Sequence, residues 1–408
     1  MISNASNVAE RDSLRRDLLD LGFDTVRFAA ADSVPPTQLR AWLEWGWQAD
    51  MDWMTRTVEK RLDPGLILAD VGTVVLFGVN YLPGEQGAAG QSRWARYALY
   101  EDYHDNILRA VRAGGGRMAA RLGLGAGDWR AYVDTGPVME RGWAAKAGMG
   151  WLGKNGMLIS RSHGNWLLLA AILIRGRIVP DEPLPGGRDM ADGPPSLGRF
   201  CGSCVRCIEA CPTGAIRQPG LIDAHRCLSW QTIENRGPIT REFRESMGGR
   251  IFGCDICLEV CPWNRFAQAG RGLLLAARFD LAELTLIELL SLTPERFAVV
   301  FRRTPLKRLR LERLLRNACV VAGNLDRDEG WNGRLGGSRD HLLNGLVGLA
   351  GSSTALVRAH AVWAVYRLEP GRARAMLEGA RAAETDETVL EEYAVWERTP
   401  HGIPTREP

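Results

Sequence analysis

Apolar and polar residues alternate along the first half of the chain in a way that predicts helices and strands in turn. Residues 8–21 carry leucines at helical spacing among charged residues, which is typical of an amphipathic helix. Residues 71–79, 129–133 and 166–174 are mostly apolar and predict strands. Helices are predicted over residues 105–122 and from Pro137 to Lys146, ended by Gly123 and Gly148. This alternation, up to about residue 180, favours an α/β or α+β domain.

The pattern changes after residue 180. Residues 180–198 hold five prolines and four glycines, a composition that indicates a connection. From about residue 282 the pattern is helical, with helices predicted over residues 306–325, 341–350, 354–368, 371–381 and 385–396. Consecutive helices of this kind suggest a short α-solenoid of HEAT-like repeats. We therefore expect an α+β protein with an α/β domain at residues 1–180, a cysteine-rich module at residues 199–265 and an all-helical domain at residues 282–408.

Composition narrows the class of protein. The chain has 408 residues, a net charge of +3 and 46% hydrophobic residues, which is ordinary for a globular protein. No apolar run is long enough to cross a membrane, so no membrane association is expected. The N-terminus lacks the apolar core of an export signal, so we expect a cytoplasmic protein. Nothing in the heptad pattern demands assembly, and we expect a monomer.

Eight of the nine cysteines fall in one short region, residues 201–261, with a spacing that indicates iron–sulfur ligation. The first set, Cys201 to Cys211-Pro212, follows C-x2-C-x2-C-x3-C-P, and the fourth cysteine of this pattern binds the other cluster in two-cluster ferredoxins. The second set, Cys254 to Cys261-Pro262, lacks its first cysteine, which Cys227 can supply. The prediction is two 4Fe–4S clusters with crossed ligation. Cluster one takes Cys201, Cys204, Cys207 and Cys261, and cluster two takes Cys211, Cys227, Cys254 and Cys257.

Structural zinc is the alternative for these cysteines. Zinc sites favour two C-x2-C pairs, which this spacing fits less well than it fits cluster ligation. Two clusters in one chain also suit an electron relay. The ninth cysteine, Cys319, lies in an apolar helical stretch and is expected to be a core residue.

Asp134 stands where a predicted strand ends and a helix begins, in the segment VDTGPVME. Strand ends are where open α/β sheets place ligands. The alternative is that Asp134 or Thr135 caps the helix, and the local sequence alone favours that interpretation. A helix N-terminus would also lower the pKa of the aspartate, which opposes a role as an acid.

Three further features stay open on the local sequence. The glycine-dense segment 146–156 fits either a tight turn or a close backbone approach to a large ligand. His104 and His163 are more simply explained as hydrogen-bonded residues than as metal ligands. Residues 301–316 hold seven Lys or Arg against one Glu, which fits a solvated helix face or a surface that tracks RNA phosphates.

Several segments together resemble the epoxyqueuosine reductase family over nearly the whole chain. They are RYALYEDYH (96–104), YVDTGPVMER (132–141), residues 142–169, the two cysteine sets, CLSWQTIE (227–234) and RNACVVAGNL (316–325). Members of that family use cobalamin and two 4Fe–4S clusters to reduce the epoxide of epoxyqueuosine to queuosine at the wobble base of tRNA. The D-x-H-x-x-G cobalamin motif is absent here, as the resemblance implies.

The resemblance also implies roles for single residues. Asp134 matches the catalytic acid of the family, which reverses the preference for a helix cap. The residues that match cobalamin contacts are Thr57, Tyr97, Asp134, Lys154, Asn155, Leu158, Ser229, Trp230 and Gln231. The implied partners are a tRNA with a queuosine-type wobble position, held at phosphates by residues 301–316, and an external electron donor.

Two rival classes remain on sequence grounds. A cobalamin-dependent reductive dehalogenase also uses two clusters, but usually carries an export signal and lacks a helical tail. A ferredoxin-type electron carrier needs only residues 199–265, and leaves the first 180 residues unexplained. A tRNA-binding scaffold without catalysis is a third possibility.

Overall fold

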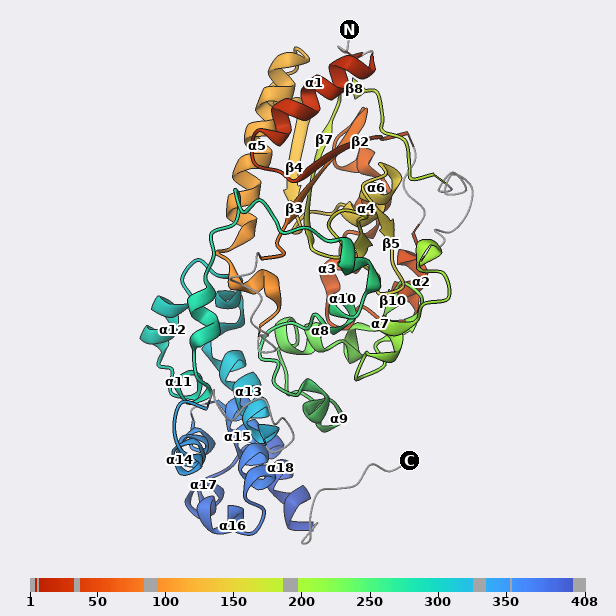
Figure 1. Cartoon of the computed structure of the whole chain (residues 1–408). Helices are drawn as coiled ribbons and strands as arrows, with labels where there is room; N and C mark the ends of the chain where they lie inside the picture. Colours follow the sequence, from red (N-terminus) through yellow and green to blue (C-terminus); the bar gives the residue numbers. More distant parts are fainter. Residues whose placement is uncertain are drawn as a thin grey trace. The chain divides into compact units, whose positions relative to one another are not determined.

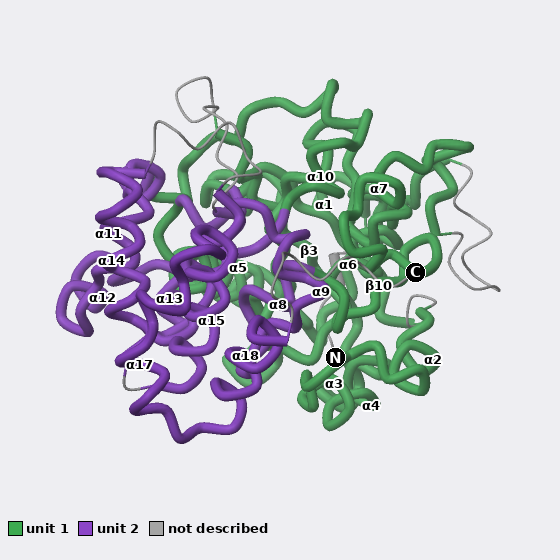
Figure 2. The backbone as a smooth tube through the Cα atoms, turned by 90° about the horizontal axis from the view of Figure 1, so that it is seen from below, with its two compact units in different colours: residues 1–89, 100–227, 255–277 green, residues 90–99, 228–254, 278–408 purple. Residues whose placement is uncertain are grey.

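The chain forms two compact units whose sequences interleave. The structure, a computed structural model, describes residues 4–5, 7–32, 37–83, 94–185, 197–325, 335–352 and 354–398. Unit 1 comprises residues 1–89, 100–227 and 255–277, and unit 2 comprises residues 90–99, 228–254 and 278–408 (Figure 2). This division differs from the three consecutive domains expected from the sequence, which stay a prediction.

Unit 1 is built on a four-stranded sheet in the order β2-β3-β7-β4, formed by Thr25–Ala30, Thr73–Asn80, Leu167–Ile174 and Trp129–Val133 (Figure 1). Three of these strands confirm the prediction, whereas β2 was missed. Every neighbouring pair is antiparallel. The unit is therefore α+β, and the expectation of an α/β domain over residues 1–180 is wrong, because an α/β domain is built on parallel strands.

Helices cover both faces of this sheet. Helices α1 (Val8–Leu19) and α5 (Tyr103–Arg121) lie on one face, and α6 (Glu140–Lys146) lies on the other (Figure 1). A Cβ atom at Gly115 of α5 would lie 2.5 Å from the ring of Trp129 in β4, so glycine is required for this close approach. On the opposite face, Trp143 of α6 packs in one apolar cluster with Leu76 of β3 and Leu173 of β7.

Shorter elements complete unit 1. They are β1 (Asn4–Ala5), α2 (Leu39–Glu44), α3 (Asp52–Arg56), α4 (Val58–Leu62), β5 (Trp151–Leu152), β6 (Leu158–Ile159), β8 (Arg177–Ile178), α7 (Arg206–Glu209), β9 (Ile216–Gln218), β10 (Leu221–Ile222) and α10 (Ile256–Glu259). The connection predicted over residues 180–198 is described only at its two ends, because residues 186–196 lie outside the described part of the chain.

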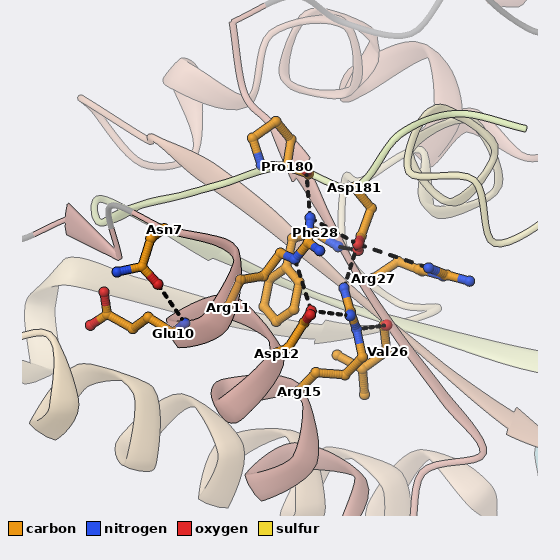
Figure 3. Close-up of polar contacts among 10 residues, drawn as sticks. All are labelled: Asn7, Glu10, Arg11, Asp12, Arg15, Val26, Arg27, Phe28, Pro180 and Asp181. Atoms are coloured by element: carbon orange, nitrogen blue, oxygen red, sulfur yellow. Dashed lines mark hydrogen bonds and ion pairs between the residues drawn. The ribbon is translucent and has the colours of Figure 1, made fainter.

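Asp181 fixes the start of that connection to the sheet. Its carboxylate accepts a hydrogen bond from the backbone N–H of Phe28 at 2.8 Å (Figure 3). It also forms ion pairs with Arg15, with Arg11 at 3.4 Å and with Arg27 at 3.8 Å (Figure 3). Arg11 in turn donates to the carbonyl of Pro180. One buried carboxylate therefore balances three guanidinium groups from α1 and β2.

Asp181→Asn should lower the stability of unit 1 by about 2–3 kcal/mol, because it leaves three arginines around a neutral, buried amide. The measurement is the urea midpoint of unfolding followed by far-UV circular dichroism. Asp12→Asn is the matched control, since Asp12 pairs with the same Arg11 and Arg15 but is more exposed. Equal midpoints for the two variants would contradict the role of Asp181.

Unit 2 is helical. Its helices are α8 (Leu228–Ile233), α9 (Arg241–Arg244), α11 (Leu286–Leu290), α12 (Pro294–Val300), α13 (Arg310–Gly323), α14 (Arg339–Ala350), α15 (Ala355–Leu368), α16 (Ala373–Met376), α17 (Glu378–Ala382) and α18 (Glu387–Arg398). The helical C-terminal region confirms the prediction, and a HEAT-like repeat stays a prediction. Cys319 is fully buried in α13, as expected.

Two helix boundaries in unit 2 differ from the prediction. Residues 306–325 are not one helix, because a 3-10 helix at Pro305–Leu309 precedes α13 and Arg310 takes a φ of +59° at the junction. Residues 371–381 break at Leu377 into α16 and α17. Among the described residues, no helix has the length and apolar character to cross a bilayer.

Candidate functional site

Asp134 occupies a strained turn directly after β4. Its φ is +57°, and the N–H of Thr135 donates to the carbonyl of Val133 at 2.5 Å, which makes Asp134 the central residue of a γ-turn. Such turns are rare for non-glycine residues and cluster at functional sites. A Cβ at Gly136 would lie 2.2 Å from the ring of Tyr132, so the turn requires glycine there. Helix α6 begins at Glu140, so the helix-cap interpretation of Asp134 and Thr135 is wrong.

The N-terminus of α5 carries the partners of Asp134. The hydroxyl of Tyr103 donates to Oδ2 of Asp134 at 2.7 Å, and Nε2 of His104 lies 3.6 Å from the same oxygen. The other ring nitrogen of His104, Nδ1, lies 2.7 Å from Oδ1 of Asp102. Asp102 also caps α5, because Oδ1 accepts the backbone N–H of His104. The imidazole is therefore held between two carboxylates.

These contacts shift the two pKa values in opposite directions. Burial lowers the pKa of His104, but its hydrogen bond with Asp102 and its ion pair with Asp134 outweigh burial and raise the pKa to about 9. The ion pair with His104 lowers the pKa of Asp134 below its usual value, with further lowering by the hydrogen bond from Tyr103 and by the charge of Arg141. Because 64% of the Asp134 side chain is exposed, these contacts outweigh the effect of burial, and the pKa of Asp134 shifts downwards. At neutral pH the pair is an imidazolium next to a carboxylate.

Glu140 is a second carboxyl group near Asp134. Burial, together with the charge of Asp134, raises the pKa of Glu140 to about 8, although the charges of Arg61 and Arg141 act to lower it. Arg61 donates to the hydroxyl of Thr57 at 3.0 Å and to the carbonyl of Val138 at 3.4 Å. Thr57, expected as a cobalamin contact, thus supports an arginine that holds the loop after Asp134.

Four of the predicted cluster ligands line one small pocket in unit 1. They are Cys201, Cys204, Cys207 and Cys261, and Lys154, Asn155, Ile159, Pro262 and Trp263 complete the lining. Burial, followed by the charges of Cys201 and Cys261, raises the pKa of the Cys207 thiol to about 11. These four are the ligands assigned to cluster one by the crossed scheme.

The two cysteine sets repeat one local structure. Each has a one-turn helix, α7 or α10, followed by Cys-Pro, and the two helices pack together. The N–H of Cys211 donates to Ile208 O at 3.3 Å, and the N–H of Cys261 donates to Leu258 O at 3.2 Å. In the described residues, no three His, Cys, Asp or Glu side chains converge on a single metal ion. The four ligands of a 4Fe–4S cluster bind separate iron atoms, so their side chains do not have to converge on a single point.

The four ligands assigned to cluster two belong to both units. Cys211, Cys227 and Cys257 belong to unit 1, and Cys254 belongs to unit 2. Within unit 1, Thr213 and Arg226 exchange side-chain-to-backbone hydrogen bonds at 2.5 and 2.8 Å, which tie the segment of Cys211 to that of Cys227.

Lys154 and Asn155 turn towards the cysteine pocket. Nζ of Lys154 donates to the carbonyls of Gly202 and Cys204 at 2.7 and 3.1 Å. The amide of buried Asn155 donates to Asn165 Oδ1 at 2.8 Å and to the carbonyl of Cys257 at 3.2 Å. Leu158 is buried in β6. These three side chains, expected at cobalamin, are already engaged inside unit 1.

Sequence reasoning missed two asparagines that extend this network. Nδ2 of Asn165 donates to Asn264 Oδ1 at 3.1 Å, and Asn264 donates to the carbonyl of Leu258 at 2.6 Å. Asn165 also hydrogen-bonds the Cys261 thiol. These residues are far apart in sequence, and no spacing pattern marks them.

A mostly apolar cavity of about 180 Å³ lies elsewhere in unit 1. It is lined by Thr37, Gln38, Leu39, Trp42, Met54, Met139, Arg141, Gly142, Leu152, Gly156, Leu197, Gly220, Leu221 and Ile222. Gly156, with a φ of +73°, brings the backbone of the glycine-dense segment to this cavity. The cavity can accept an apolar ring system beside a single arginine.

Unit 2 carries the remaining predicted contacts. Ser229, Trp230 and Gln231 lie in α8, and Tyr97 lies 6.0 Å from Phe252, ring to ring. Arg316 and Asn317 of α13 hold α8 in place. Arg316, fully buried, donates to the carbonyls of Gln231, Asn235 and Gly237. Asn317 donates to the carbonyls of Thr232 and Ile251, both at 2.8 Å.

Only part of the basic segment 301–316 is exposed to solvent. Arg302, Arg303, Lys307, Arg308 and Arg310 are exposed, whereas Arg316 is buried and was wrongly assigned to the exposed face. The guanidinium of Arg313 is turned inwards to the carbonyl of Ile233 at 2.8 Å. Arg308 forms an ion pair with Glu234 at 2.6 Å. Five exposed cations remain within nine residues.

Comparisons with known proteins agree on one family. A model described as "4Fe-4S double cluster binding domain" matches residues 200–264, and one described as "Epoxyqueuosine reductase QueG, DUF1730" matches residues 61–135. Epoxyqueuosine reductase of Escherichia coli K12 is 36% identical over 318 residues, covering 76% of this chain and 80% of that protein.

Solved structures show the same fold. An epoxyqueuosine reductase bound to a tRNA-Tyr stem loop modified with epoxyqueuosine matches with a TM-score of 0.73 and 23% identity, covering 97% of this chain and 100% of the other. The Bacillus subtilis epoxyqueuosine reductase, described with an aspartate-bearing catalytic loop swung out of the active site, matches with a TM-score of 0.75 and 24% identity. It covers 96% of this chain and 99% of its own.

Proposed function

The chain belongs to the epoxyqueuosine reductase family, and from this premise we propose how its own residues serve that reaction. The chain is an oxidoreductase that acts on epoxyqueuosine in tRNA and carries two 4Fe–4S clusters. Opening the epoxide to the cyclopentene of queuosine consumes two electrons and two protons and releases water. The protein has to hold the base, bring the electrons and deliver a proton to the departing oxygen. The dehalogenase, electron-carrier and scaffold alternatives are set aside.

The observation that carries the acid assignment is the shared contact of Tyr103 and His104 with one oxygen of Asp134. We assign Asp134 as the group that meets the departing oxygen. Because its pKa is lowered and that of His104 is raised, the proton resides on His104 until the oxygen develops negative charge. The proton then passes through Asp134 to the oxygen, while Asp102 keeps the imidazole oriented.

The residues around the large cavity of unit 1 fit part of a cobalamin. Its lining offers apolar side chains such as Trp42 and Met139, a glycine-lined wall at Gly156, and the cation of Arg141. We propose that the segment 153–158 contacts the cofactor through its backbone, since Lys154 and Asn155 use their side chains at the cysteine pocket. Bound cobalamin would supply a cobalt centre that transfers electrons to the epoxide.

The crossed ligation is our proposal for the clusters. Support comes from the pocket that gathers Cys201, Cys204, Cys207 and Cys261. Cluster one would accept electrons from outside, and the cluster of Cys211, Cys227, Cys254 and Cys257 would pass them on. Tyr97 and residues 229–231 are proposed cofactor contacts, and Arg316 and Asn317 keep α8 in the required position.

We propose that the tRNA backbone is bound at the exposed part of residues 301–310. Five exposed cations in this short stretch suit phosphates, and binding should weaken steeply with salt. The wobble base has to be turned out of the anticodon loop to reach a protein site, as is usual for single-stranded RNA targets. We expect the enzyme to act as a cytoplasmic monomer.

The experiment that tests the function is an anaerobic assay on tRNA that bears epoxyqueuosine, with the nucleosides resolved by mass spectrometry. The enzyme is reconstituted with iron and sulfide, and cobalamin and reductant are each omitted in turn. Loss of one oxygen that needs both additions supports the proposal. Retention of the oxygen with both clusters and bound cobalamin present would refute it.

His104→Gln should lower turnover about 10- to 100-fold, because glutamine keeps a hydrogen bond but cannot carry the proton. Single-turnover rates at saturating tRNA measure the effect. His225→Gln is a suitable control, since His225 is an exposed histidine that makes a similar contact with Asp223. Equal rates for wild type and His104→Gln would remove His104 from the acid pair.

A further inference from the structure

The surface of unit 1 around the cysteine pocket combines exposed arginines with exposed apolar side chains. Arg161, Arg199, Arg206 and Arg265 are exposed there, against the exposed Glu209 and Glu259. Val205 is 37% exposed and Phe266 is 47% exposed. Val205 and Arg206 stand between the pocket cysteines Cys204 and Cys207 in the chain. Exposed apolar side chains that are surrounded by polar residues are a common feature of protein–protein contact sites.

A chain of ring contacts joins this surface to the pocket. Trp263 lines the pocket, and its ring lies 5.6 Å from exposed Phe266 and 4.7 Å from Trp151. The ring of Trp151 lies 5.2 Å from Phe200. An arginine lies at each end of this series of ring contacts. The guanidinium of Arg265 lies 4.5 Å over the ring of Phe266, and that of Arg161 lies 6.0 Å over the ring of Phe200.

The segments that bear these residues are tied together. The N–H of Gln268 donates to the carbonyl of Ser162 at 3.1 Å, which places the loop of Arg161 beside the segment of Arg265 and Phe266. The cysteines themselves are only partly buried. A partner on this surface therefore comes close to the thiolates without any rearrangement of unit 1.

We propose that this surface, the donor face of Val205, Phe266, Arg161, Arg206 and Arg265, docks an acidic protein that carries one electron at a time. The proposal rests on the proposed function, which requires an external reductant. In each encounter the carrier is oxidised by one electron and the cluster of the pocket goes from its 2+ to its 1+ state. Two encounters supply the two electrons that one epoxide consumes.

Charge and apolar area both favour a protein carrier. Excess positive charge steers an acidic partner and raises its association rate, with a strong dependence on ionic strength. The two apolar side chains give a small contact area, as is typical of transient electron-transfer complexes. The arginines would also attract RNA, but Val205 would add nothing to its affinity, and RNA does not need to approach the cluster.

The test follows reduction of the clusters in the reconstituted enzyme by stopped flow, without tRNA. The probes are photoreduced flavodoxin, an acidic one-electron carrier, and dithionite, a small reductant. The test variant is Arg161→Glu with Arg206→Glu and Arg265→Glu. The matched control is Arg109→Glu with Arg112→Glu and Arg130→Glu, three exposed arginines of α5 and β4 that give the same net charge.

The rate constant with flavodoxin should fall about tenfold or more in the test variant and lose its dependence on salt. The rate with dithionite, the visible spectrum and the affinity for a tRNA stem loop should stay as in wild type. Titration with oxidised flavodoxin should show the same loss of binding. Phe266→Ser, which leaves the charges unchanged, should slow the flavodoxin reaction and not the dithionite reaction.

A wild-type rate with flavodoxin in the test variant, or an equal loss in the control, would overturn the proposal. Loss of tRNA affinity with an unchanged flavodoxin rate would assign the face to RNA instead, and also overturns it. Because cluster reduction is read without tRNA, its outcome is independent of whether the enzyme reduces epoxyqueuosine.

Discussion

Asp134→Asn should lower turnover about 10²- to 10⁴-fold, while the enzyme keeps its clusters and its tRNA affinity. Asparagine has nearly the same shape and can still accept a hydrogen bond from Tyr103, so the γ-turn and the N-terminus of α5 should stay in place. What it cannot do is pass on a proton. The measurement is the single-turnover rate of oxygen loss from epoxyqueuosine, with tRNA binding measured in parallel.

Two companion variants separate proton transfer from folding. Asp105→Asn changes an exposed carboxylate in the first turn of α5 and should leave the rate unchanged. Tyr103→Phe removes one hydrogen bond to Asp134 but no titrating partner, so it should cost less than Asp134→Asn. Turnover by Asp134→Asn within about threefold of wild type would show that another group delivers the proton.

Paired cysteine substitutions should reveal crossed ligation through iron content. Cys201→Ala with Cys261→Ala removes two ligands of the same proposed cluster, so the other cluster should survive and half of the iron should remain. Cys201→Ala with Cys211→Ala removes one ligand from each cluster, so nearly all iron should be lost. Iron analysis after anaerobic reconstitution, together with electron paramagnetic resonance of the reduced protein, measures both outcomes.

Uncrossed ligation predicts the reverse ranking of the two double variants. Cys319→Ala is the control for loss of a cysteine as such, because Cys319 is buried in the core of unit 2. It should keep the full iron content. A full loss of iron from the pair Cys201→Ala and Cys261→Ala would contradict the crossed scheme.

Features that depend only on residues close together in the sequence could be predicted from it. Strand β4 and the buried position of Cys319 follow from local apolar pattern, and cluster-binding capacity follows from cysteine spacing. Strand β2 was missed because Arg27 interrupts its short apolar run, and its pairing with β3 is not visible in its own residues. The antiparallel order of the sheet is likewise a property of pairing that no single strand encodes.

The acid site could be predicted only in part. Asp134 was identified through family resemblance, while its local sequence suggested a helix cap. The role of His104 was missed because the contact with Asp134 joins residues thirty positions apart in the chain. Arg316 was misplaced for a similar reason, since its position in a basic segment gives no hint of three carbonyl partners in and around α8.

The pH dependence of the single-turnover rate tests the central claim, that His104 holds the proton which Asp134 delivers. The raised pKa of His104 keeps it protonated at neutral pH, and this protonation is lost as the pH rises through about 9. We therefore predict a rate that is level at neutral pH and falls with a midpoint near 9, and a rate without that fall in His104→Gln. A wild-type rate that stays level through pH 9, or one that falls already with the ordinary pKa of a carboxyl group, would contradict the account.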